Sequence, residues 1–133
     1  MVAGDREAIS SLWSSSELGE PADDEWEALV EGETTLILVA EVEGAVAGVG
    51  VASFDGWRAY IYHLSVAPDQ RGHGVAHALM AQAEEYLIEA GARYVYVMIP
   101  EVNTEGLALA ASSGYLPEGD LVLSKRLAQR VSG

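Results

Sequence analysis

The stretch that decides the fold is Val66-Ala-Pro-Asp-Gln-Arg-Gly-His-Gly-Val-Ala76. An apolar, β-branched run ends at Val66, and a proline-containing turn stops it. A loop with Gly72 and Gly74 then leads directly into a helical pattern that begins at Val75. A strand followed by a glycine-containing loop and a helix is the first half of a βαβ unit. The segment therefore predicts an α/β protein built around this junction.

The flanking segments complete the unit. The strand before the loop covers Ala59–Val66, and the helix after it covers 75–90, with Gly91 as its end. A compact apolar strand follows at Tyr94–Ile99. Strands joined by a crossover helix lie parallel in one sheet. We therefore expect 59–66 and 94–99 to be parallel neighbours.

Upstream and downstream patterns predict a mixed sheet with flanking helices. Helical spacing predicts helices over 4–18 and from Asp23 to Gly32, and β-rich runs at Thr34–Val42 and Val46–Phe54 predict an antiparallel meander with 59–66. A short helix over Asn103–Ser113 and a last strand at Leu121–Leu127 follow. The expected fold class is α/β (α+β), with a mostly antiparallel twisted sheet and a central βαβ unit in a single domain, 1–133.

Composition narrows the function classes. The 133 residues carry 21 acidic and 7 basic side chains, a net charge of −14, and no cysteine. This balance disfavours nucleic-acid binding and favours a cationic small molecule or basic peptide, although the charge can also serve solubility alone. Disulfides and thiolate metal sites are excluded. We find no membrane span and no signal peptide, so we expect a cytoplasmic protein with no membrane partner.

The loop at Arg71–Ala76 is a candidate anion cradle. Helix N-termini present unpaired backbone N–H groups, the glycines permit close approach, and Arg71 adds positive charge. The alternative is a plain glycine turn before a helix. The loop is not a P-loop, because no Gly-Lys-Ser/Thr follows. It does not fit the dinucleotide fingerprint either, because His77 replaces the third small residue.

These residues resemble the GNAT family of N-acetyltransferases, whose pyrophosphate loop reads Arg/Gln-x-x-Gly-x-Gly/Ala. Arg71-Gly-His-Gly-Val-Ala76 fits this pattern at each constrained place. Asn103, followed by Gly114-Tyr115, is similar to the family's last motif. Asp55-Gly-Trp-Arg58 and the run Leu123–Leu127 are similar to small bacterial members. The resemblance covers nearly the whole chain.

The resemblance implies an acetyl-CoA site and direct attack of a primary amine on the thioester, without a covalent enzyme intermediate. The parallel strands would separate to admit the pantetheine arm, and a backbone N–H of the central strand would steady the thioester oxygen. The resemblance implies that the strand backbone of Leu64, Ser65 and Val66 contacts the pantetheine and that the side chain of Asn103 lies beside it. The pyrophosphate would be bound by the loop residues Arg71, Gly72, His73, Gly74, Val75 and Ala76.

The proton-transfer residues depart from the family pattern. Many relatives carry a tyrosine seven residues after the asparagine, where this chain has Ala110. Solvent, Ser113 or Tyr115 would have to replace that acid. By strand alternation Tyr60, Tyr62 and Leu64 share one face, and His63 faces the other way and packs. Tyr62 is our first candidate for contact with the amine and Tyr60 the second; the alternative is that both are packed strand aromatics.

Three functions remain open at this point. The first is an acetyl-CoA-dependent N-acetyltransferase acting on a small amine, a polyamine or a peptide or protein amine. The second is an acyl-CoA-binding module with weak or no turnover, suggested by Ala110, and the third is an unrelated phosphate-binding domain. No metal is expected, because His73 and His77 lack a third ligand nearby. A homodimer that uses the strand at 121–127 is left open.

Overall fold

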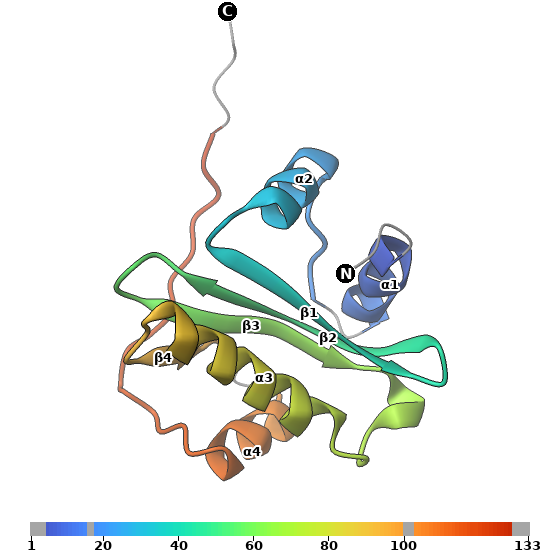
Figure 1. Cartoon of the computed structure of the whole chain (residues 1–133). Coiled ribbons are helices and arrows are strands. Elements are labelled where there is room, and N and C mark those ends of the chain that lie inside the picture. Colours follow the sequence, from blue (N-terminus) through green and yellow to red (C-terminus); the bar gives the residue numbers. More distant parts are fainter. Residues whose placement is uncertain (1–4, 16–17, 100–102, 129–133) are drawn as a thin grey trace, which may run out of the picture.

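The computed structural model describes residues 5–15, 18–99 and 103–128 (Figure 1). Within these residues the chain forms a four-stranded sheet in the order β1-β2-β3-β4. The first three strands are antiparallel, and β3 and β4 are parallel. The predicted mixed, mostly antiparallel sheet around a βαβ unit is therefore confirmed. The strands are β1 (Thr35–Val42), β2 (Ala45–Phe54), β3 (Ala59–Val66) and β4 (Val95–Val97).

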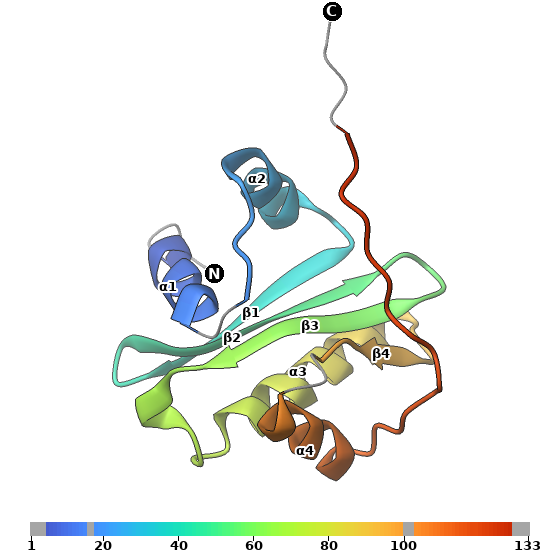
Figure 2. The ribbon, with the colours of Figure 1, turned by 180° about the vertical axis from the view of Figure 1, so that it is seen from behind.

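Helices cover both faces of the sheet (Figures 1 and 2). On one face α1 (Asp5–Ser15) and α2 (Asp23–Glu31) pack over β1 and β2, and on the other face lies α3 (Val75–Ala90). The short helix α4 (Thr104–Ser112) packs beside α3. None of the helices in the described parts of the chain is both long and apolar enough to span a bilayer.

Each face has its own apolar core. Trp13 is fully buried at the centre of the first, between α1, α2 and the sheet. Leu87 and Met80 anchor the second, between α3 and the sheet. The apolar stripe of α3 is buried as its helical spacing predicts, and glycines in the left-handed conformation bound this helix at Gly74 and Gly91.

The contact between β3 and β4 is short and decides where the sheet opens. Only Ala59–Ile61 pair with Val95–Val97, and the rest of β3 continues to Val66 without a strand on that side among the described residues. The expected strand at Tyr94–Ile99 is thus three residues long. The two parallel strands separate beyond Ile61 and Val97, at the end of the sheet that leads to the glycine loop.

The prediction of a last strand at Leu121–Leu127 is wrong. Residues 121–128 form no regular structure and run past β4 as an exposed extended segment (Figure 2). The segment is attached near its start, where the Tyr94 hydroxyl donates to the Glu118 carboxylate at 2.7 Å. Apolar alternation favours a strand only where the backbone pairs with a sheet edge, and residues 121–128 pair with neither edge strand, β1 nor β4.

Candidate active site

A β-bulge in β3 lies directly after the last residue paired with β4. Val51 of β2 pairs with Tyr62, and Val49 pairs with Ser65, so His63 and Leu64 together face Gly50. The backbone of His63 has φ +52°, in the left-handed region that non-glycine residues rarely adopt. Trp13 Nε1 donates to the His63 carbonyl at 2.9 Å and holds it there. Strained backbone of this kind concentrates at functional sites.

The bulge changes which side chains share a face. The rings of Tyr62 and His63 lie 5.7 Å apart, and the His63 ring also meets Trp13 at 5.2 Å, so both point toward α1 and α2. Leu64 packs instead with the core beneath α3. The expectations that Leu64 shares a face with Tyr60 and Tyr62, and that His63 faces away from Tyr62, are therefore wrong. One inserted residue shifts the alternation by one.

His63 is the candidate that sequence reasoning missed. Its Nε2 lies 3.1 Å from the carbonyl oxygen of Gly19. A carbonyl only accepts, so Nε2 carries the hydrogen, and in the neutral ring Nδ1 keeps a lone pair that can take a proton. The signal that could have located the bulge is the pair Gly48 and Gly50 in β2, because interior strand glycines mark bulges and close approaches.

A cavity of about 370 Å³ opens on the α1–α2 face beside the bulge. Tyr62 and His63 of β3 line it, together with Glu20 from the α1–α2 connection and Glu25 of α2. Burial raises the pKa of the Tyr62 phenol, so this group is a neutral hydrogen-bond donor near pH 7. The two carboxylates give the cavity a negative lining that favours a cationic group.

The residues expected to contact the pantetheine lie where β3 is unpaired toward β4. Ser65 and Val66 pair with Val49 and Gly48 on the β2 side, which leaves the opposite edge of this segment without a strand in the described part of the chain. The Ser65 side chain points to α1, where its hydroxyl donates to the Leu12 carbonyl at 3.3 Å. An extended molecule can therefore reach the backbone of Leu64–Val66.

The glycine loop continues from this edge into α3. After a single turn of 3-10 helix at Pro68–Gln70, Gly72 and Gly74 adopt φ +81° and +80°. A Cβ at either position would meet no atom within 4 Å, so the backbone conformation and not the packing requires glycine. Arg71 folds back so that its Nε donates to the Val66 carbonyl at 3.4 Å. The N-terminal N–H groups of a 16-residue helix therefore face open space beside a guanidinium.

The remaining predicted residues flank this loop or lie away from it. Asn103 is the exposed N-cap of α4, and its Oδ1 accepts from Gly106 N at 2.9 Å. His73 is exposed in the loop, whereas His77 reaches α4, with Nε2 3.1 Å from Ser112 Oγ. In the described ranges no group of three potential metal ligands comes together.

The Tyr115 side chain packs against the core beneath α3. Its hydroxyl is buried and makes no hydrogen bond of ordinary length among the described residues. Burial, then the charge of the nearby Glu84 carboxylate and a weak hydrogen bond to it, raise the pKa of Tyr115 to about 12. Ala110 is itself buried within α4.

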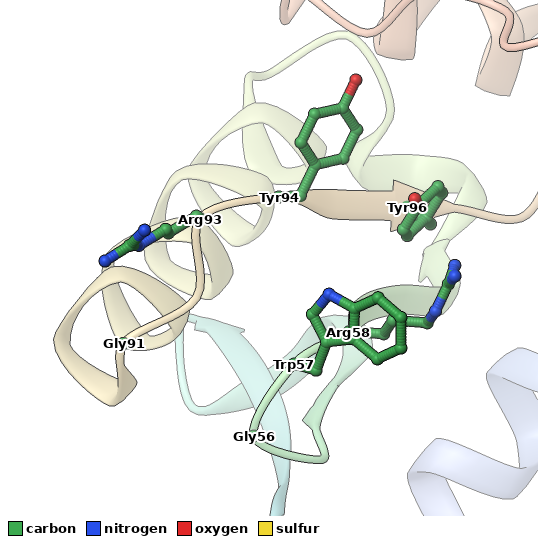
Figure 3. A pocket seen from close by; sticks show the side chains of 7 residues that line it. All are labelled: Gly56, Trp57, Arg58, Gly91, Arg93, Tyr94 and Tyr96. Carbon is green, nitrogen blue, oxygen red and sulfur yellow. The ribbon is translucent and has the colours of Figure 1, made fainter.

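A second cavity, of about 580 Å³, lies at the far end of β3 and β4 (Figure 3). It contains none of the residues expected to contact acetyl-CoA or the amine, although Gly56, Trp57 and Arg58 belong to the run at 55–58, and it combines aromatic rings with arginines. Its lining comes from the β2–β3 turn, the end of α3 and β4: Gly56, Trp57, Arg58, Gly91, Arg93, Tyr94, Tyr96.

Comparison with known proteins assigns the family. Residues 6–115 match the profile described as the acetyltransferase (GNAT) family. This match covers most of the chain, so the protein belongs to the GNAT family, which consists of acetyl-CoA-dependent N-acetyltransferases.

Solved structures share the fold at low identity. A transcriptional regulator from Bacillus halodurans C-125 has a TM-score of 0.81 and 14% identity, with 96% of each chain covered. A ribosomal-protein-alanine N-acetyltransferase from Brucella melitensis biovar Abortus 2308 has a TM-score of 0.74 and 20% identity, over 95% of this chain and 96% of that one. The aminoglycoside N-acetyltransferase AAC(6')-Iy in complex with CoA has a TM-score of 0.78 and 18% identity, over 96% and 97%.

Proposed function

We propose that the chain moves an acetyl group from acetyl-CoA to a primary amine by direct attack. The observation that carries this proposal is the separation of β3 and β4 immediately before the bulge and the glycine loop. The opening offers an unpaired strand edge for an extended arm and a helix N-terminus for its pyrophosphate. Acetyl-CoA has both parts, and it supplies the acetyl thioester.

Different parts of the chain bind different parts of acetyl-CoA. The backbone of Leu64–Val66 binds the pantetheine arm, and the loop at Arg71–Ala76 surrounds the pyrophosphate with N–H groups and one guanidinium. The N-terminus of α4 at Asn103 flanks the arm. A backbone N–H next to the bulge at His63 stabilises the oxygen that becomes negative during attack.

The acceptor amine enters the cavity beside the bulge. Glu20 and Glu25 attract the ammonium form, and His63 Nδ1 takes the proton that makes the amine nucleophilic. Tyr62 donates a hydrogen bond because its phenol stays protonated, and Tyr60 lies one alternate position further along the same face. The departing thiolate takes its proton from water, since a thiol pKa near ~8.5 lets it leave without a fixed acid.

A second candidate is an acyl-CoA-binding module with little or no turnover. One observation favours it: Ala110 stands where many relatives carry the tyrosine. Both candidates bind acetyl-CoA, and only the enzyme releases free CoA thiol when an amine is added. A thiol-release assay with a panel of primary amines separates the two.

Calorimetric titration with acetyl-CoA tests the cofactor site. We expect Arg71→Glu to weaken binding at least about tenfold, because it replaces a phosphate-binding charge with a repelling one. Arg126→Glu is the matched control, since it makes the same charge change on the exposed segment after α4. Unchanged affinity in Arg71→Glu, or no binding by the folded wild type, would contradict the proposal.

Steady-state kinetics test the acceptor side. We expect His63→Gln to lower kcat by about 10²–10⁴-fold while the affinity for acetyl-CoA stays the same, as for loss of a general base. Glutamine can still donate to the Gly19 carbonyl, so the bulge keeps that contact. Tyr62→Phe should cost less, because it removes one hydrogen bond. Full activity in His63→Gln would remove His63 from the mechanism.

A further inference from the structure

A row of aromatic side chains connects the two cavities. Tyr62 and Tyr60 lie two residues apart on β3 and so point to the same face. The Tyr60 ring lies 5.7 Å from that of Tyr96 on β4, which lies 5.5 Å from that of Tyr94. The row therefore runs from the proposed amine site to the cavity at the far end of β4.

Arg58 stands at the far end of this row. Its guanidinium carbon lies 4.6 Å from the centroid of the Trp57 ring and 5.7 Å from that of Tyr96 (Figure 3). Trp57 is 75% exposed, so the stack borders open space. The aromatic contacts fix the position of a side chain that would otherwise be mobile.

The guanidinium of Arg58 has no carboxylate partner among the described residues. The nearby carboxylate of Asp55 accepts instead from the backbone N–H groups of Trp57 and Arg58, at 2.8 and 2.7 Å. The ion pair of the described chain is formed elsewhere, by Arg6 and Asp23. In a chain of net charge −14 this leaves a positioned guanidinium outside the salt bridges of the described residues, although, after the two backbone hydrogen bonds, its charge helps to lower the pKa of the Asp55 carboxyl.

A planar guanidinium with free donors recognises a carboxylate in two-point fashion. The opposite end of the row carries Glu20 and Glu25, which attract an ammonium group. Along β3, Tyr62 and Tyr60 are about 7 Å apart, and Tyr62 and Arg58 about 13 Å. The row of rings therefore has carboxylates beside its Tyr62 end and a guanidinium beside Tyr96.

We propose that the acceptor is an amino carboxylate, with its primary amine at Tyr62 and His63 and its carboxylate at Arg58, roughly 7–13 Å away. Arg58 is then the specificity-determining residue. This inference rests on the proposed acetyl transfer. It also replaces the composition-based preference for polyamines and basic peptides. The acceptor meets the charges near Tyr62 and at Arg58, and not the net charge of the whole chain.

The test compares acceptors of equal length that differ at one end. CoA release is measured with ω-aminooctanoate, n-octylamine and α,ω-diaminooctane, and with tetra-alanine and its C-terminal amide to distinguish a small amino acid from a peptide. We expect the wild type to prefer a carboxylate-bearing acceptor by about tenfold or more in kcat/KM. Arg58→Gln should remove that preference by raising KM for the carboxylate-bearing acceptors. The kcat/KM for n-octylamine should stay the same.

Arg6→Gln is the matched control. Arg6 also lies over a tryptophan, 5.2 Å from the Trp26 ring, but this α1 residue is paired with Asp23 at the start of α2. It should keep the preference. Equal use of the three octyl acceptors by the wild type, with no preference for tetra-alanine over its amide, would overturn the inference, as would an equal loss on all acceptors in Arg58→Gln.

A binding measurement separates this inference from the proposed function. Trp57 adjoins Arg58, so titration with ω-aminooctanoate or tetra-alanine should change its fluorescence in the CoA-saturated protein, and Trp57→Phe should abolish the signal. Binding that Arg58→Gln weakens about tenfold, without turnover, supports the inference and contradicts acetyl transfer. Turnover that does not depend on the carboxylate of the acceptor supports acetyl transfer and contradicts the inference. No binding of either ligand at millimolar concentration overturns the inference.

Discussion

His63 shows how one backbone torsion arranges this site. Its left-handed conformation inserts an extra residue opposite Gly50 and turns two consecutive side chains, Tyr62 and His63, toward the same cavity. The Trp13 indole holds the carbonyl of His63 from 50 residues away along the chain. An imidazole and a phenol are thereby placed side by side.

Tyr115 gives a prediction on pH. Its pKa is raised to about 12, above the value near 10 of an unfolded tyrosine, so its contribution to stability is full below pH 10 and lost as the pH rises toward 12. Tyr115→Phe has no proton to lose. We expect the melting temperature of the wild type to fall more steeply between pH 10 and 12 than the melting temperature of the variant.

At neutral pH the same substitution should be harmless. The buried hydroxyl makes no hydrogen bond of ordinary length in the described structure, although Glu84 is near enough to raise its pKa, so its removal should change the free energy of unfolding by no more than about 1 kcal/mol. A loss of more than that in Tyr115→Phe, measured by urea denaturation at pH 7, would show that the hydroxyl is bonded.

At the scale of elements, the glycines of β2 set how closely α3 approaches the sheet. A Cβ at Gly48 would lie 2.9 Å from both Leu79 Cδ1 and Val75 Cγ1, and 3.2 Å from the Ser65 carbonyl oxygen. At Gly50 the close contact is Leu64 Cδ1 alone, at 2.8 Å, the end of a flexible side chain.

We therefore expect Gly48→Ala to lower the free energy of unfolding by about 1–3 kcal/mol, as overpacking does, and Gly50→Ala to cost less. Urea denaturation of both variants is the measurement. The reverse order would mean that α3 moves more easily than Leu64 repacks. Neither position makes a hydrogen bond through its side chain, so the comparison isolates packing.

The elements that could be predicted are those with local signals. The helix at 75–90 agrees with the structure because glycines bound it and its stripe is regular. The apolar pattern at 121–127 predicted a strand that the structure lacks, and the strand predicted at 94–99 is only three residues long. Both errors have the same cause, because a strand needs a neighbouring strand to pair with, and no local pattern reveals that neighbour. The loop at 71–76 was located because its motif is contiguous, whereas the cavity beside His63 joins residues from α1, α2 and β3.

At the scale of the whole molecule, the segment after α4 exposes a series of large apolar side chains. Their exposed fractions range from 75% to 88%: Leu116, Leu121, Val122, Leu123, Leu127. Contiguous apolar surface of this kind marks an interaction site. We expect the chain to form a homodimer through this segment, and expect Leu121→Ser with Leu123→Ser to weaken it.

Light scattering after size-exclusion chromatography, at micromolar concentration, measures the mass of both proteins. A monomeric wild type would contradict the expectation. Ser124→Ala, on the same segment, is the control that should leave the mass unchanged. High salt should not dissociate the dimer, because apolar burial and not ion pairing holds it.

The sequence by itself determined the βαβ junction, the glycine loop and its fit to the family, because these depend on the conformational preferences of residues that are neighbours along the chain. Tertiary structure alone decided where β3 and β4 separate, that His63 joins Tyr62, and that Arg58 stacks on Tyr96. These features rest on contacts between residues distant in the sequence, such as Trp13 with His63, and no local pattern encodes them.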